Sequence, residues 1–206
     1  MIVCLIEWSS KLEGETYMIL VVAITGATGV IYGVRLLQFL KKNTNVETHL
    51  IISKVGQKII QEETDTSLST VRNLATYNHD VNDLSAPISS GPFPTDGMVI
   101  IPCTMKTLAG IACGYSENLI LRAADVTLKE DRPLILVPRE TPLNMIHLQN
   151  MLKLAKCGAI ILPPMPALYH KPITVDDIVA YTVGKVLDLL KIRHSLYQPW
   201  KTPTKT

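Results

Sequence analysis

An arginine and a glutamate stand side by side in residues 138–142 (PRETP), directly after the apolar run 134–137. An arginine guanidinium can hold a phosphate through two parallel hydrogen bonds. A partly buried glutamate beside it could serve as a general acid or base. A structural ion pair is the alternative, although adjacent residues on an extended segment tend to point in opposite directions. The pair therefore predicts phosphate binding by Arg139 and proton transfer by Glu140.

A glycine-rich turn, residues 25–29 (TGATG), comes after another apolar run, residues 19–24. Glycine permits a tight turn and a close backbone approach. The helix expected after this turn would offer free N–H groups and the positive end of its dipole to an anion. We expect Gly26, Ala27 and Thr28 to contact a phosphate or a flavin, with an ordinary strand-to-helix turn as the alternative.

Hydroxyl groups come after two further apolar runs, residues 46–52 and 98–101. The hydroxyl of Ser53 can donate or accept and so suits a flavin ring or ribityl chain, but a serine here is also a common helix N-cap. Two threonines and a lysine after the second run suit phosphate or flavin contacts, with capping by the first threonine as an equal alternative. The residues of this turn are Thr104, Met105, Lys106 and Thr107.

Two other groups of residues could meet a phosphorylated substrate. The proline-rich residues 163–166 form a stiff loop that would hold Tyr169, whose ring and hydroxyl suit an apolar phosphate ester. Arg122, Asp125 and Lys129 share one helix face by their spacing. A solvated stripe of ion pairs is the plainer interpretation of that face.

Alternating strand and helix patterns must position these residues. The predicted strands cover residues 19–24, 46–52, 98–101, 134–137 and 159–162. The predicted helices cover residues 30–42, 54–63, 67–77, 107–113, 118–130, 143–156 and 175–190. This alternation predicts an α/β fold with a single doubly wound parallel sheet and helices on both faces. Ligands of such folds bind at the carboxyl ends of the strands, where the candidate residues stand.

The bulk composition narrows the class of protein. The chain has 206 residues, 47% of them hydrophobic and 18% charged, which suits one globular domain. A net charge of +2 gives no signature of nucleic-acid binding. No apolar run approaches the roughly 20 residues of a membrane helix. Four scattered cysteines without metal-site spacing are expected to be buried thiols in a reducing, cytoplasmic compartment, and no metal site is expected.

The ends of the chain differ from its centre. Residues 1–17 do not resemble the rest of the chain, and Met18 begins a clean strand. We expect residues 1–17 to be an N-terminal extension, with Met18 as a candidate native start. Residues 18–195 then form the folded domain, and the polar residues 196–206 form a flexible tail.

Six segments, in this order and spacing, resemble the UbiX-type flavin prenyltransferases, once described as hydroxybenzoate carboxy-lyases. They are ITGATGVIYGVRLLQ, ETHLIISK, SSGPF, MVIIPCTMKTLAGIA, RAADVTLKEDRPLILVPRETP and PPMPALYHKP. The resemblance implies a Rossmann-like flavoprotein that joins a dimethylallyl group from dimethylallyl monophosphate to N-5 and C-6 of FMN, without a metal. It also implies that prenylated FMN serves UbiD-type decarboxylases, and that the protein forms homo-oligomers, often dodecamers, with sites at subunit boundaries.

The resemblance also implies roles for individual residues. The FMN site would comprise Gly26, Ala27, Thr28, Ser53, Thr104, Met105, Lys106, Thr107 and Arg139. The prenyl phosphate would be held by Tyr169 and Lys185, with Lys129 and Arg122 as further candidates. Glu140 would move protons while phosphate departs. Positive charge would stabilise the leaving group, and an apolar pocket would protect the allyl cation from water.

Three positions depart from the pattern of relatives. Many relatives carry an arginine where this chain has Lys185, which keeps the charge but lacks the bidentate fork. Some have a serine in place of Thr28, and some have a tryptophan near Leu84 that could stabilise a cation by its π face. Rate or prenyl preference is therefore expected to differ.

Three other functions compete with this interpretation. A short-chain dehydrogenase would use a Tyr-x-x-x-Lys pair, which Tyr181 and Lys185 match, but the glycine spacing is one residue too long and no acidic residue ends the second strand. A flavin-dependent cysteine decarboxylase would carry a PASANT-like loop where this chain reads PCTMKT. A non-catalytic FMN storage module would have no need of Glu140.

Overall fold

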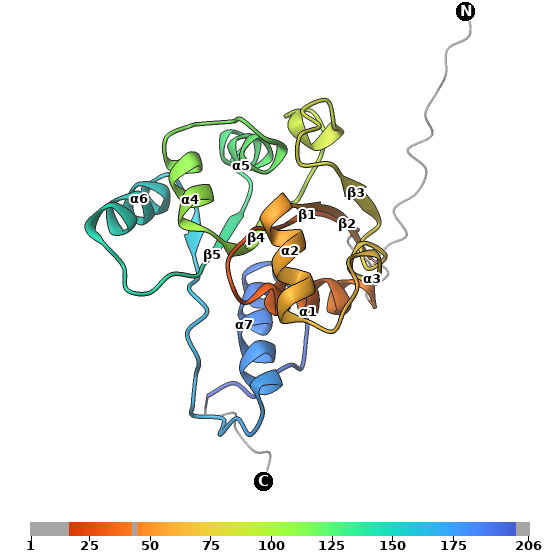
Figure 1. Cartoon of the computed structure of the whole chain (residues 1–206), viewed down its shortest axis with the longest axis vertical. Coiled ribbons are helices and arrows are strands. Elements are labelled where there is room, and N and C mark those ends of the chain that lie inside the picture. The colour runs from red at the N-terminus through yellow and green to blue at the C-terminus, as the bar shows by residue number, and fades with distance from the viewer. Residues whose placement is uncertain (1–16, 43–44, 201–206) are drawn as a thin grey trace, which may run out of the picture.

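The computed structural model describes residues 17–42 and 45–200. These residues form a six-stranded sheet in the order β3-β2-β1-β4-β5-β6, and every neighbouring pair is parallel (Figure 1). The strands are β1 (Met18–Ile24), β2 (Val46–Ile52), β3 (Tyr77–His79), β4 (Gly97–Cys103), β5 (Leu134–Pro138) and β6 (Ile160–Ile161). The predicted α/β fold with one parallel sheet is therefore confirmed.

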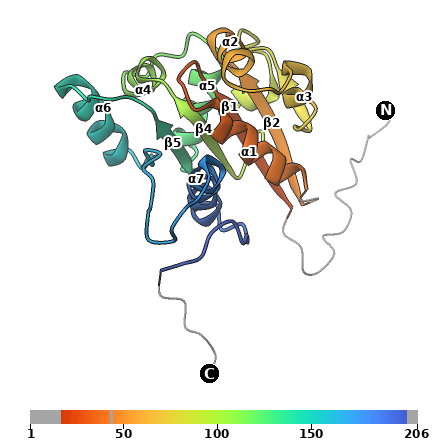
Figure 2. The ribbon, with the colours of Figure 1, turned by 60° about the horizontal axis from the view of Figure 1, so that its bottom comes forward.

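Helices cover both faces of this sheet, as predicted (Figure 2). One layer comprises α1 (Val30–Lys41), α2 (Lys54–Glu63), α3 (Leu68–Arg72) and α7 (Val175–Leu189). The other comprises α4 (Met105–Ala112), α5 (Leu119–Lys129), α6 (Met145–Lys156) and the short 3₁₀ helix Pro87–Ser89.

The strands are buried from both sides because their side chains alternate. Leu20, Val22 and Ile24 of β1 face one core cluster, which includes α1 and α7. Val21 and Ala23 face the other, which includes α4 and α5. This is why the strands are continuous apolar runs in the sequence.

The prediction of a helix over residues 67–77 is wrong in its second half. Helix α3 ends at Arg72, and Tyr77–His79 forms the edge strand β3, paired with β2 through His49, Leu50 and Ile51. A three-residue polar strand carries no alternating pattern of its own. It exists because β2 offers free ladder groups and because the ring of His49 packs on Tyr77.

The prediction that the cysteines are buried is confirmed only in part, and the predicted division of the chain ends stays a prediction. Cys103 is buried as predicted, but Cys113 and Cys157 are exposed, because both lie in turns at helix ends. Residues 1–16 of the predicted extension, which include Cys4, and residues 201–206 of the predicted tail lie outside the described residues. Leu196 packs against the first core cluster. Among the described residues, no helix combines the length and apolar character needed to cross a bilayer.

Candidate functional site

A cavity of about 490 Å³ lies at the carboxyl ends of β1, β2 and β4. Its volume is within the roughly 300–1,000 Å³ of small-molecule sites. Of the predicted residues, its wall contains Gly26, Ser53, Thr104, Lys106 and Thr107. It also contains residues that the sequence did not suggest, among them Val81, Asn82, Glu117 and Asn118. The strand-end rule thus brings most of the predicted flavin-binding residues to one place.

The glycine turn brings β1 and the start of α2 into close contact. A Cβ atom at Gly26 would lie 2.4 Å from Cγ1 of Val55, so this approach requires glycine. Gly29 has φ of 91°, a left-handed conformation that suits glycine, and directly precedes α1. Its N–H donates to a carboxylate oxygen of Glu63 at 2.8 Å. The start of α1 therefore already binds one anionic group, as expected of a helix N-terminus.

Thr25 is a structural residue of the site that sequence reasoning missed. Its Oγ1 donates to the carbonyl of Pro102 at 2.7 Å and accepts from the N–H of Thr104 at 2.9 Å. Only 2% of the residue is exposed. The hydroxyl therefore joins the turn after β1 to the turn after β4. A threonine at the very end of an apolar strand was the available signal.

Three hydroxyl or amide side chains at the cavity are also helix caps. Ser53 accepts from the N–H of Gly56 at 3.0 Å, and Thr104 accepts from that of Thr107 at 3.1 Å. Asn118 caps α5 in the same way, and its place before an apolar helical pattern could have revealed it. The capping alternatives are thus confirmed, and the capped helices direct three N-termini at the cavity.

In the turn after β4, the side chains of Lys106 and Met105 point to different places. Lys106 lines the cavity and makes no ion pair with any described residue. Met105 packs against the second core cluster and is absent from the cavity wall, unlike its neighbours. Its side chain is the apolar anchor of this turn, so any flavin contact by Met105 would come from its backbone.

Arg139 and Glu140 come directly after β5 and are both exposed. Burial raises the pKa of Tyr32, and the positive charge of Arg139 partly offsets that rise, so the guanidinium lies near the first turn of α1. A carboxylate oxygen of Glu140 accepts from the N–H of Thr141 at 3.1 Å. The expected partial burial of Glu140 is wrong for the single chain, because the segment after β5 runs along its surface.

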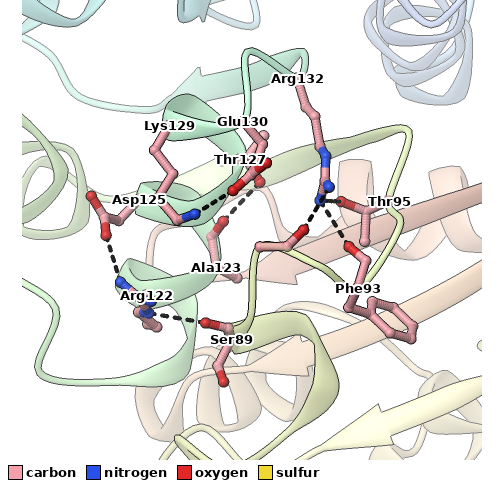
Figure 3. Close-up of polar contacts among 11 residues, drawn as sticks. Ser89, Phe93, Thr95, Arg122, Ala123, Asp125, Thr127, Lys129, Glu130 and Arg132 are labelled. Carbon is pink, nitrogen blue, oxygen red and sulfur yellow. Dashed lines mark hydrogen bonds and ion pairs between the residues drawn. The ribbon is translucent and has the colours of Figure 1, made fainter.

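A cluster of cations lies along α5 and the segment after it (Figure 3). Arg122 donates through Nε to the carbonyl of Ser89 at 3.0 Å and pairs with Asp125 at 2.8 Å. The expected ion pair on this helix face is therefore present. Lys129 pairs with Glu130 rather than with Asp125.

The same cations hold the loop that contains SSGPF. Arg132 donates to the carbonyls of Gly91 at 2.8 Å and Phe93 at 2.9 Å (Figure 3). The loop lies against the ion pair of Lys129 and Glu130, since a Cβ atom at Gly91 would lie 2.1 Å from Oε1 of Glu130 and 2.5 Å from Nζ of Lys129. Arg122 and Lys129 thus flank one loop, and each is paired with a carboxylate there, Arg122 with Asp125 and Lys129 with Glu130.

Tyr169 and Lys185 lie elsewhere in the single chain. The ring of Tyr169 meets that of Trp200 edge-on, with centroids 5.3 Å apart. Lys185 is on α7 and pairs with Asp188 at 3.1 Å. Helix α7 packs on the opposite face of the sheet from α5 (Figures 1 and 2). One chain therefore does not bring Tyr169 and Lys185 together with Arg122 and Lys129, because the sheet separates them.

Comparison with known proteins decides the family. A profile of the flavoprotein family matches residues 8–187. A probable UbiX-like flavin prenyltransferase from Streptomyces sp. (strain D7) is 55% identical over 183 residues, which are 89% of this chain and 92% of that protein. The chain belongs to the UbiX-type flavin prenyltransferases of the flavoprotein family. The flavin prenyltransferase UbiX of Methanocaldococcus jannaschii is 51% identical over 185 residues, 90% of this chain and 100% of that protein.

Solved structures of UbiX-type proteins have the same fold. AnUbiX (PadA1), in complex with FMN and dimethylallyl pyrophosphate, superposes with a TM-score of 0.88 at 48% identity, covering 91% of this chain and 99% of that one. A dodecameric FMN-dependent UbiX-like decarboxylase from Escherichia coli O157:H7 gives 0.88 at 53% identity, covering 90% and 100%. The cysteine decarboxylase TvaF shares only 16% identity, so its TM-score of 0.56 reflects the fold alone.

Proposed function

We propose that this protein is a flavin prenyltransferase that joins the dimethylallyl group of dimethylallyl monophosphate to FMN. The observation that carries the proposal is the cavity at the strand ends, whose wall combines the glycine turn, Ser53 and the Thr104–Thr107 turn. The AnUbiX structure, 48% identical, contains both FMN and a dimethylallyl ester. Prenylated FMN would then pass to a UbiD-type decarboxylase, and we place the reaction in the cytoplasm.

The donors of the cavity fit FMN. The backbone N–H of Thr28 and the capped N-termini of α2 and α4 suit the polar edge and ribityl chain of a flavin, whereas the N–H of Ala27 already donates to the carbonyl of Thr25 at 3.0 Å. Lys106 and Arg139 supply the positive charge that a phosphate requires. Among the described residues, no group of three His, Cys, Asp or Glu side chains is arranged to hold a metal ion, and the proposal includes none.

The prenyl phosphate site is proposed to be shared between subunits. Arg122 and Lys129 stand on one side of the sheet, and Tyr169 and Lys185 on the other. All four can hold one phosphate only if a second copy of the chain supplies two of them. A surface for that copy exists on α6, where Met145, Ile146, Leu148 and Leu152 are 49–67% exposed. The E. coli relative is dodecameric, which favours a homo-oligomer here.

The proposed chemistry depends on charge and on the exclusion of water. The cations Arg122, Lys129 and Lys185 stabilise negative charge on the departing phosphate. Glu140, exposed in one chain, would be covered by the neighbouring subunit and would exchange protons with the flavin and the phosphate. Exclusion of water from the covered site protects the allyl group from hydrolysis.

Anaerobic incubation with reduced FMN and dimethylallyl monophosphate tests the proposal. Mass analysis of the released flavin should show a gain of one five-carbon prenyl unit, and a parallel reaction with the diphosphate identifies the preferred donor. Glu140→Gln should bind FMN but form little product. Unmodified FMN from protein that binds it would contradict the transferase and favour storage or a cysteine-type decarboxylase. Activation of an apo UbiD-type decarboxylase by the released flavin tests the recipient.

A further inference from the structure

Two histidines, one buried and one partly exposed, form a pair that the proposed reaction does not use. His49 lies in β2 with 4% of its side chain exposed, and His79 ends the edge strand β3. Nδ1 of His49 is 2.9 Å from Nε2 of His79. Nε2 of His49 is 2.9 Å from a carboxylate oxygen of Glu47, whose other oxygen accepts from the hydroxyl of Tyr17 at 2.5 Å.

The contact between the two rings allows only one proton between them. One nitrogen must donate and the other accept, so the pair holds while at least one of the facing nitrogens lacks its proton. If both rings become imidazolium ions, two N–H groups and two positive charges face each other. The rings are stacked, with centroids 5.1 Å apart and planes at 7°, so they cannot avoid this repulsion without moving apart.

The groups around the pair favour a neutral His79. Burial lowers the pKa of His79 below its ordinary value of 6.5, His49 lowers it further, and Asp83 opposes the shift. Tyr77 and Phe93 pack against His49 with centroids 4.9 and 5.3 Å away. Arg72 and Asp80 bring opposite charges to a cavity of about 200 Å³ that His79 also lines.

The sign of the pH dependence depends on the direction of this shift. A histidine whose pKa is lower in the folded state stabilises the fold fully above the unfolded value of 6.5. That stability is lost as the pH falls through the lower, folded-state pKa. The contact between β2 and β3 is therefore expected to weaken in mildly acidic solution.

This histidine pair is connected both to the cavity at the strand ends and to the loop beside α5. The chain that leaves β3 passes directly to Val81 and Asn82, which line the large cavity at the strand ends. The carbonyl of Val81 accepts from the N–H of Leu119 at 2.8 Å, which ties it to α5. Phe93, which meets His49 edge-on, belongs to the loop that Arg132 holds beside Arg122 and Lys129 of α5.

We propose that His79 is a positioning residue, and that its single-proton contact with His49 fixes the β3 exit so that the cavity binds FMN more tightly in neutral than in mildly acidic solution. The part that concerns FMN rests on the proposed function of the cavity. The hydrogen-bonded geometry of the pair, and its connection through Val81 to α5, hold independently of the ligand.

The test is the dissociation constant for FMN between pH 5.5 and 7.5, in the full chain and its variants. His79→Gln retains an N–H donor for His49 but cannot be protonated, so it should bind FMN normally at pH 7.5. The phosphate of FMN itself titrates near pH 6, and its contribution is common to all variants. We expect the affinity of the unmodified protein to fall about tenfold more than that of His79→Gln, which is the usual size of a coupling between two sites.

Two further variants test whether the effect on FMN binding is specific to the contact between His79 and His49. His79→Leu removes the donor and should weaken FMN binding throughout the range. His147→Gln is the matched control, because His147 caps α6 next to β6 at the opposite edge of the sheet, and glutamine preserves its capping box. It should keep the full pH dependence.

Hydrogen exchange of residues 77–82 without FMN distinguishes failure of this proposal from failure of the proposed function. Exchange, corrected for the intrinsic effect of pH, should accelerate below pH 6.5, and His79→Gln should abolish that acceleration. Parallel FMN profiles for the unmodified protein and His79→Gln, or equal exchange in both, would overturn the role of His79. If FMN does not bind at any pH but hydrogen exchange still differs between the unmodified protein and His79→Gln, the flavin assignment is overturned. The role of the His49–His79 pair in fixing the β3 exit then still stands.

Discussion

The hydroxyl of Thr25 is the side-chain group that holds the turns after β1 and β4 together. Thr25→Val keeps the shape but leaves the N–H of Thr104 without its acceptor, whereas the carbonyl of Pro102 still accepts from the backbone N–H of Thr25 at 3.2 Å. Buried groups left unpaired in this way cost about 1–3 kcal/mol. We expect that loss in the free energy of unfolding by urea, together with weaker FMN binding. Thr25→Ser should restore both, and equal stability of the valine and serine variants would contradict the assignment.

At the scale of single residues, the thiol of Cys103 should be far less reactive toward alkylation than those of Cys113 and Cys157. Burial raises the pKa of the Cys103 thiol to about 12, and the side chain is fully enclosed, whereas Cys113 and Cys157 are exposed. Thiolate is the reactive form. Iodoacetamide at pH 8, followed by peptide mass mapping, should label Cys113 and Cys157 but not Cys103. Labelling in guanidinium chloride is the control, in which all three should react.

Helix α1 lies unusually close to β4 at the element scale. A Cβ atom at Gly33 would be 2.5 Å from the carbonyl oxygen of Ile101. Overpacking costs about 1–3 kcal/mol, which exceeds the roughly 0.5–1 kcal/mol that alanine gains over glycine within a helix. Gly33→Ala should therefore lower the free energy of unfolding. Gln38→Ala, on the same helix, should leave it nearly unchanged, and a stabilised Gly33→Ala protein would show that α1 can move outward freely.

At the scale of the whole molecule, the outward face of α6 should determine assembly. Leu152 is 56% exposed in the single chain, so Leu152→Glu should cost little folding stability if the chain acts alone. In a homo-oligomer that uses the outward face of α6, the Leu152→Glu substitution would bury a charge between subunits. We expect dissociation in light scattering and loss of prenyl transfer, because Tyr169 and Lys185 would no longer meet Arg122 and Lys129. Gln61→Glu adds the same charge on α2 and should preserve assembly. An unchanged oligomer would rule out this face.

Much of this arrangement was predictable from the residues alone. The apolar runs that precede Ser53, Thr104 and Arg139 located the strand ends. Parallel strands that are buried on both faces need a continuous apolar sequence. The family was recognisable from the motifs that surround those ends. Helix capping was the predicted alternative role for Ser53 and Thr104. Both residues do cap helices, and both also lie in the cavity wall.

The sequence by itself determined the parallel sheet, the order of its elements and the cluster of polar residues at the strand ends, because local periodicity and turn residues encode these directly. Only the tertiary structure decided the edge strand β3, the His49–His79 contact and the separation of Lys185 from Lys129 by the sheet. These features depend on which distant segments become neighbours. A three-residue strand and a pair of histidines thirty positions apart leave no periodic trace in the chain.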